Sequence, residues 1–172
     1  MLDKVLVAYA SRTGSTVGVA EAVGKTLAEH GAEVDVRAMK EVSDLSAYKA
    51  VVVGSANQNR QWLPEAMDFV RANRAALGKV PTAAFLVCMT LAMRRGDYRD
   101  QVSAWLDPVH ALVKPVSVGL FPGALDISKI PSRSDRLKFR LSVMFGVWTE
   151  GDHRDWSAIL AWTESLLPLL ML

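Results

Sequence analysis

Short apolar runs of strand length alternate with amphipathic stretches along most of this chain, and this alternation constrains the fold more than any other feature. Apolar residues nearly fill three runs, as in parallel strands that are covered on both faces: 4–10, 50–55 and 82–88. The run 116–121 is predicted to be the last strand. A fifth run, 33–38, alternates polar and apolar residues, which indicates a half-exposed strand nearer an edge of the sheet. Strands that alternate with helices imply right-handed crossovers, so the sequence predicts an α/β fold: a doubly wound five-stranded parallel sheet with helices on both faces.

The intervals between these runs carry apolar residues at helical spacing. They predict one helix over about 19–27 and another over 66–77, which Pro64 is well placed to open. A third helix is expected over 102–113, where Pro108 kinks or splits it. A final helix from about residue 155 is expected to place five residues on one face: Trp156, Ile159, Leu160, Thr163 and Leu167.

The length of 172 residues predicts a single domain, residues 1–172, that needs no disulfide or metal to fold. Cys88 is the only cysteine, so there is no internal disulfide, and the three histidines lie near no cysteine, so no metal site is predicted. Because the sequence has no secretory signal and no apolar stretch of about 20 residues, we expect a cytoplasmic protein. A net charge of +2 is too weak to suggest a nucleic-acid partner.

Hydroxyl side chains are concentrated in the loop between the first predicted strand and the first predicted helix. Four of its six positions carry a hydroxyl, and the glycine among them lets the backbone approach a ligand closely. In a doubly wound sheet this loop lies where ligands bind, and the helix start adds positive potential. The loop therefore predicts a site for a phosphate monoester, whose candidate residues are Ser11, Arg12, Thr13, Gly14, Ser15 and Thr16. A simple helix cap is the alternative interpretation, but it requires only one hydroxyl.

Three other phosphate motifs are excluded. The pattern Gly-x-Gly-x-x-Gly of dinucleotide sites is absent. The stretch 18–26 resembles a P-loop, but its glycines are wrongly spaced and it lies inside a predicted helix. A phosphoacceptor receiver domain would need acidic residues after the first and third strands, where this chain has Ala10-Ser11 and Ser55-Ala56.

The pattern formed by Ser11, Thr13, Gly14 and Thr16 resembles the FMN phosphate loop of the flavodoxin family. Within that superfamily, the chain is most similar to the branch of the menaquinone-dependent protoporphyrinogen IX dehydrogenases. Four features carry this closer resemblance, and together they extend over most of the chain: Arg12, 54–60, 121–125, and the basic stretch 129–148 with the residues that follow it. The resemblance implies a flavodoxin-like fold with one bound FMN.

The resemblance also implies that two loops enclose the flavin ring. Trp62 is a candidate for stacking on the ring, although hydrophobic packing beside Pro64 is an equally good interpretation. Thr90 either hydrogen-bonds the ring edge or caps the next segment. One loop would supply Ala56, Asn57, Gln58, Asn59 and Trp62, and the other would supply Met89, Thr90, Leu91 and Ala92.

Charge separates two functions that such a flavoprotein could have. Flavodoxins that act as electron carriers are generally acidic, whereas this chain has a net charge of +2. The resemblance therefore implies an FMN-dependent oxidoreductase that passes electrons from a reduced, protoporphyrinogen IX-like substrate to a quinone. No catalytic residue is assigned. The alternatives are a flavodoxin-like electron-transfer protein with another redox enzyme as its partner, and a flavin-binding regulatory module without turnover.

Basic and apolar residues are combined in the stretch 129–148. Leu137, Leu141, Met144 and Trp148 repeat there at helical spacing beside five basic residues. The stretch has three interpretations: contact with the inner face of the cell membrane, binding of porphyrin propionates, or packing on the domain with a solvated basic face. The apolar C-terminus, 166–172, is too short to span a membrane, and it packs on the domain, forms a homodimer or touches lipid.

Overall fold

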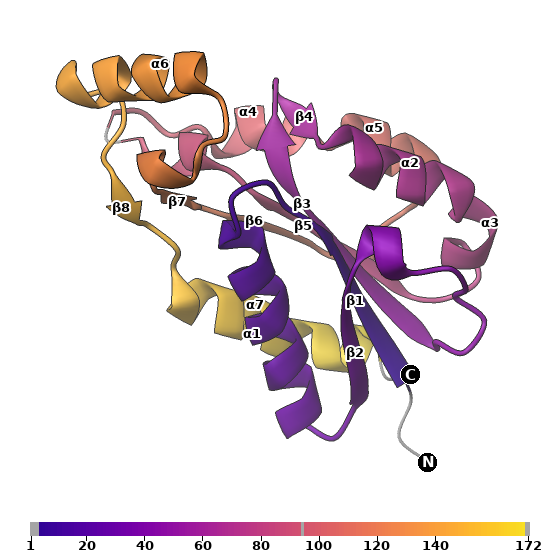
Figure 1. Cartoon of the computed structure of the whole chain (residues 1–172). Coiled ribbons are helices and arrows are strands. Elements are labelled where there is room, and N and C mark those ends of the chain that lie inside the picture. The colour runs from indigo at the N-terminus through magenta and orange to yellow at the C-terminus, as the bar shows by residue number, and fades with distance from the viewer. Residues whose placement is uncertain (1–3, 94, 171–172) are drawn as a thin grey trace.

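A five-stranded parallel sheet forms the centre of the molecule, with the strand order β2-β1-β3-β5-β6 (Figure 1). The computed structural model describes residues 4–93 and 95–170. The five strands are β1 (Lys4–Ala10), β2 (Glu33–Ala38), β3 (Ala50–Gln58), β5 (Thr82–Val87) and β6 (Val118–Phe121). A short strand, β4 (Gln61–Trp62), turns back antiparallel to the end of β3. The predicted α/β fold with a doubly wound five-stranded sheet is confirmed.

The central strands are apolar on both faces because the sheet is covered on both sides. Successive residues of β1 point to opposite faces, so Val5 and Val7 join one core while Leu6 and Ala8 join the other. The strand β2 lies at the edge of the sheet and stays partly exposed, which confirms its predicted place.

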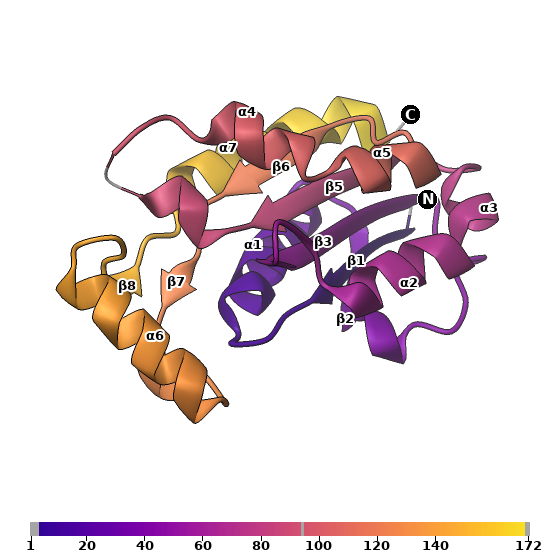
Figure 2. The ribbon, with the colours of Figure 1, turned by 90° about the horizontal axis from the view of Figure 1, so that it is seen from above.

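Two layers of helices cover the sheet, as Figures 1 and 2 show from two directions. On one face lie α1 (Ser15–Glu29) and α7 (Trp156–Leu170), and on the other lie α2 (Pro64–Ala72), α3 (Arg74–Leu77), α4 (Arg99–Ala104) and α5 (Asp107–Leu112). The predicted break at Pro108 is confirmed, because this proline lies in the first turn of α5. The helix expected over 66–77 is also divided, at Asn73.

The buried face of α7 differs from the predicted one. Ile159 and Thr163 are buried as expected, but Trp156 and Leu160 are each 44% exposed. Leu166 and Leu170 are buried instead, so this part of the apolar C-terminus packs into the core beside α1 and the sheet. Two apolar stripes overlap on this helix, and contact with α1 decides which of them is covered. Among the described residues, no helix has the length and apolar character that crossing a membrane requires.

The segment from Ala124 to Asp152, here called the cap, stands beyond one end of the sheet (Figures 1 and 2). It contains α6 (Arg133–Met144) between β7 (Ala124–Leu125) and β8 (Gly151–Asp152), which pair antiparallel. A small apolar cluster holds the cap together: Leu125, Ile127 and Ile130 are its buried members, with Met89, Phe139, Val143 and Trp148 packed against them. Because Met89 follows β5, this cluster also ties the cap to the end of the sheet.

Candidate functional site

A cavity of about 510 Å³ lies beyond the C-terminal ends of β1, β3 and β5, and we call it the strand-end cavity. Its volume falls in the range of small-molecule sites, and its place is the one where open α/β sheets bind ligands. Nine residues predicted for the site line it: Arg12, Thr13, Ser15, Ala56, Asn57, Gln58, Asn59, Met89 and Thr90. The structure thus brings together the three loops that sequence reasoning singled out.

The loop after β1 has the geometry of an anion cradle. Gly14 has a φ of 95°, which glycine adopts without strain, and a Cβ added there would meet nothing within 4 Å. Its backbone N–H donates a hydrogen bond to Ser11 Oγ at 3.1 Å. Thr16 is fully buried in the first turn of α1, and its Oγ1 has no hydrogen-bond partner among the described residues. A buried hydroxyl without a partner is costly, so the loop holds one polar group whose hydrogen-bonding capacity the described residues leave unused.

The wall opposite this loop is the hairpin between β3 and β4. Asn59 and Arg60 form its two-residue turn with φ values of 52° and 62°, as a type I′ hairpin turn requires. Asn57, at the end of β3, lines the strand-end cavity and has a buried Oδ1 without a hydrogen-bond partner among the described residues. The wall therefore combines a buried acceptor atom that has no partner among the described residues with the backbone of a tight turn.

The remaining six predicted residues lie outside the lining of the cavity. Trp62 is 2% exposed in the core beneath α2, which supports the packing interpretation rather than stacking on a ligand ring. The physical reason is the pairing of β4 with β3, which turns Trp62 inward. Ser11 and Gly14 line a hollow on the far side of the loop, Thr16 lies beneath the loop, and Ala92 follows Leu91 at the end of the 3-10 helix η2 (Met89–Ala92).

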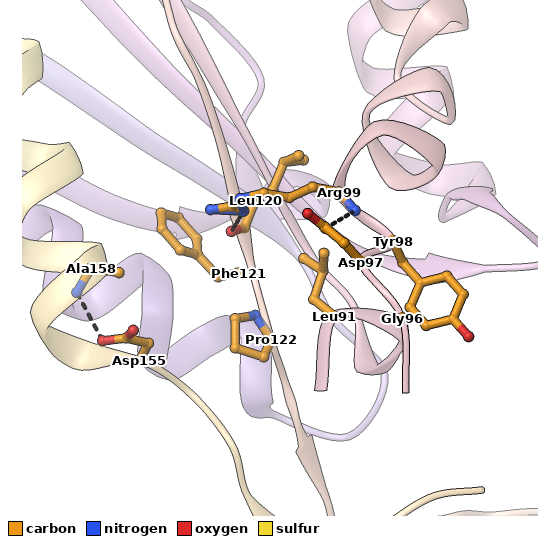
Figure 3. A pocket seen from close by; sticks show the side chains of 10 residues that line it. All are labelled: Leu91, Gly96, Asp97, Tyr98, Arg99, Leu120, Phe121, Pro122, Asp155 and Ala158. Carbon is orange, nitrogen blue, oxygen red and sulfur yellow. Dashed lines mark hydrogen bonds between the residues drawn. The ribbon is translucent and has the colours of Figure 1, made fainter. Parts of the chain in front are cut away.

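Leu91 lines a separate pocket of about 270 Å³ between the region after β5 and the start of α7 (Figure 3). Arg99 donates a hydrogen bond to the Leu120 carbonyl at 3.4 Å, and its backbone N–H donates to Asp97 Oδ1 at 3.0 Å. Asp155 accepts from the backbone N–H of Ala158 at 2.9 Å and so caps α7. The polar groups of this pocket thus serve the local structure.

The cap supplies the part of the site that sequence reasoning missed. It closes the strand-end cavity with Ala124, Leu125, Asp126, Ile130, Pro131, Asp135, Phe139 and Trp148. Leu137, Leu141 and Met144, three members of the predicted apolar stripe, are 60%, 42% and 74% exposed, so this part of the stripe does not pack on the domain. The inward face carries Phe139 and Val143 instead, and their spacing of four residues was the available signal.

Comparison with protein families decides what kind of domain carries this site. The model of a family described as flavodoxin domain matches residues 6–152. The chain belongs to the flavodoxin domain family. Its function class is accordingly that of a flavodoxin-domain redox and electron-transfer protein. Comparison with curated proteins gives no match.

Solved structures show the same fold as this flavodoxin domain. A short-chain flavodoxin associated with a non-canonical PDU bacterial microcompartment has a TM-score of 0.62 at 15% identity, over 98% of each chain. A flavodoxin from the domain Archaea has a TM-score of 0.51 at 21% identity, over 83% of this chain and 96% of its own. A Fusobacterium nucleatum flavodoxin mutant bound to flavin mononucleotide has a TM-score of 0.50 at 14% identity, over 70% of each chain. None of these findings bears on the protoporphyrinogen dehydrogenase branch, which stays a prediction.

The flavodoxin domain places its one cysteine at the strand-end cavity. Cys88 is 3% exposed, and its Sγ accepts a hydrogen bond from the backbone N–H of Thr90 at 3.3 Å. Burial raises the pKa of the Cys88 thiol, so it stays protonated and acts as a small core residue. Cys88 caps η2 in this way, and the Thr90 hydroxyl is not the cap.

Arg154 anchors the end of the cap to the anion cradle. Its guanidinium holds both oxygens of Asp152, at 2.8 and 2.7 Å, and donates to the carbonyl of Ser15 at 3.3 Å. It also lies 4.6 Å from the ring centroid of Trp156. The cap and the first turn of α1 are therefore joined by one side chain that is 19% exposed.

We expect acid to weaken this anchor. The hydrogen bonds from Arg154 lower the pKa of Asp152 from 3.8 to about 2, so the ionised carboxylate stabilises the folded state above pH 3.8 and loses its contribution as the pH falls toward 2. The variant Asp152→Asn should therefore have a lower free energy of unfolding than wild type at pH 6, and the difference should shrink by pH 3. Urea unfolding at both pH values measures it. Asp68→Asn, which removes the exposed partner of Arg71, is the control for a general loss of charge.

A difference between wild type and Asp152→Asn that is as large at pH 3 as at pH 6 would contradict this assignment. It would mean that the substitution acts through local packing and not through the charge of the carboxylate.

Proposed function

We propose that this flavodoxin domain holds FMN in the strand-end cavity and passes electrons from a reduced, protoporphyrinogen IX-like substrate to a quinone. The main observation in support of the proposal is the strand-end cavity. Residues of the anion cradle and apolar residues of the cap line this one cavity. When bound, FMN supplies the redox chemistry, while the protein orients it and controls access. The Fusobacterium nucleatum flavodoxin mutant that shares this fold is bound to flavin mononucleotide, which supports the choice of cofactor.

The residues present fit the phosphate end of FMN. The hydroxyl of Thr13 and that of Ser15 line the cavity, and the unpartnered Oγ1 of Thr16 lies beneath them. Arg12 adds a positive charge, and the start of α1 adds the potential of its free N–H groups. These groups would bind the phosphate and orient the ring toward the cap.

The cap supports the proposal of an enzyme with an organic substrate. Ile130, Phe139 and Trp148 give the outer part of the cavity an apolar wall, which excludes water from a bound ring system. Five basic side chains lie in the same stretch and would draw a substrate with carboxylates toward the cap: Lys129, Arg133, Arg136, Lys138 and Arg140. None of them lines the cavity, whose charged cap residues are Asp126 and Asp135, and these two carboxylates pair with Lys129 and Lys138. An apolar macrocycle with acidic side chains, such as a porphyrinogen, fits both properties.

The outer face of α6 supports a peripheral contact with the inner face of the cell membrane. Leu137, Met144 and Phe145 are 60%, 74% and 77% exposed, so a large apolar surface faces outward. The basic residues of the stretch complement the charge of anionic lipids. A quinone dissolved in the membrane would then lie near the cap.

Membrane contact predicts that the protein floats with vesicles that contain phosphatidylglycerol and floats less with vesicles of phosphatidylcholine alone. The double variant Met144→Ser, Phe145→Ser should lose most of this binding, because it removes the two most exposed apolar side chains of the face. Val116→Ser, at a residue that is 44% exposed elsewhere, is the matched control. Equal flotation of wild type and the double variant would refute the contact through α6.

The substrate is tested by mixing the FMN-loaded protein anaerobically with protoporphyrinogen IX and following the flavin absorbance. Prompt bleaching that a menaquinone analogue reverses is the expected result. If the flavin absorbance does not change, the porphyrinogen is not the substrate. That result would instead favour an electron-transfer protein that serves another redox enzyme.

A further inference from the structure

An ion pair connects the anion cradle to the start of α2. The two terminal nitrogens of the Arg12 guanidinium each donate to one carboxylate oxygen of Glu65, Nη1 to Oε1 and Nη2 to Oε2, the latter at 2.9 Å. Arg12 lies in the loop after β1, and Glu65 lies in the first turn of α2. A two-pronged pair of this kind fixes the orientation of the guanidinium.

This pair lies at the boundary between two hollows. Arg12 lines the strand-end cavity, and it also lines a hollow of about 460 Å³ on the other side of the loop, which we call the side hollow. Glu65 lines only the side hollow, together with Glu41. The guanidinium thus has its anionic partner on one side and the cavity of the proposed phosphate on the other.

The pair can exchange partners because it is open to water. The side chain of Arg12 is 50% exposed and that of Glu65 is 41% exposed. Exposed pairs are weakly held, and a phosphate offers the same two-pronged geometry with more negative charge. The hydrogen bond from Arg12 lowers the pKa of Glu65, so the carboxylate stays ionised at neutral pH and remains a competitor.

We propose that Glu65 sets the affinity of the anion cradle for phosphate by competing with it for the Arg12 guanidinium. The inference rests on the proposed function, because it takes the phosphate to be that of FMN. Glu65 acts through Arg12 and touches no ligand itself, so it is a positioning residue. Removing its charge would free the guanidinium for the phosphate.

The test compares FMN with riboflavin, which has the same ring system but no phosphate. Quenching of flavin fluorescence on titration with protein gives both dissociation constants. Glu65→Gln is expected to bind FMN about three- to fivefold more tightly than wild type, and to bind riboflavin unchanged. Glu41→Gln removes an equal charge from the same hollow without breaking the pair, and it should leave the FMN affinity nearly unchanged. In an Arg12→Gln background, Glu65→Gln should have no effect on FMN.

Each other outcome would overturn the inference. An unchanged or weaker FMN affinity in Glu65→Gln would mean that the pair does not compete with phosphate, or that it holds Arg12 ready for it. An equal change for FMN and riboflavin would indicate a structural role, as would an equal effect of Glu41→Gln. Wild-type protein that binds neither flavin would instead refute the proposed function, and the inference with it.

Discussion

The substitution Thr13→Glu is expected to reduce the affinity for FMN by more than about a hundredfold while the protein stays folded. Thr13 lies in the anion cradle and lines the strand-end cavity, so a carboxylate there would lie against the phosphate. Two like charges about 4 Å apart near a protein surface repel by roughly 4 kcal/mol. This repulsion exceeds the free energy that corresponds to a hundredfold loss of affinity. The fold should persist because Thr13 is only half-buried and belongs to a loop. Fluorescence titration with FMN measures the loss.

Two controls isolate the charge from the change of shape. Thr13→Gln introduces a side chain of the same length without a charge and should cost far less FMN affinity than Thr13→Glu. Riboflavin lacks the phosphate, so its affinity should be nearly the same for wild type and Thr13→Glu. Unchanged FMN affinity in Thr13→Glu would show that the phosphate does not bind in this loop.

The substitution Phe85→Ala should lower the free energy of unfolding by about 3–5 kcal/mol. Phe85 lies on β5, an inner strand between β3 and β6, and is fully buried. Its ring centroid lies 6.4 Å from that of Phe121 on β6 and 6.1 Å from that of Trp162 on α7. Removing the ring therefore leaves a cavity between the sheet and the helix that carries the end of the chain. Urea unfolding of wild type and the variant measures the difference.

Gly54 provides an internal check of this prediction. A Cβ added at Gly54, on the neighbouring strand β3, would lie 2.0 Å from the ring of Phe85. Gly54→Ala should therefore destabilise the wild-type protein by about 1–3 kcal/mol, and it should cost less when Phe85 is already alanine. Strictly additive effects, or a loss below about 1 kcal/mol for Phe85→Ala, would contradict the packing described for this core.

The sequence by itself determined the sheet and the cradle. After Lys4 the run 4–10 is apolar and β2 alternates, so local composition already indicated that β1 is an inner strand and β2 an edge strand, whereas the other edge strand, β6, was not identified as one. The cradle was equally visible, since hydroxyls and Gly14 follow the first strand directly. Both features depend on short stretches of contiguous residues and on the geometry of a single strand or turn.

The tertiary structure alone decided which side chains of the later segments face inward. Trp62 is buried because β4 folds back on β3, and α7 buries Leu166 and Leu170 because α1 lies against that side. In the cap, Phe139 faces the strand-end cavity while the helical stripe that contains Leu137 faces outward. A helix with two apolar stripes has no preference of its own between them, because the choice depends on where remote elements pack. Tertiary structure also decided the pairing of Arg12 with Glu65, because the loop after β1 and the first turn of α2 meet only when β1 and β3 lie side by side.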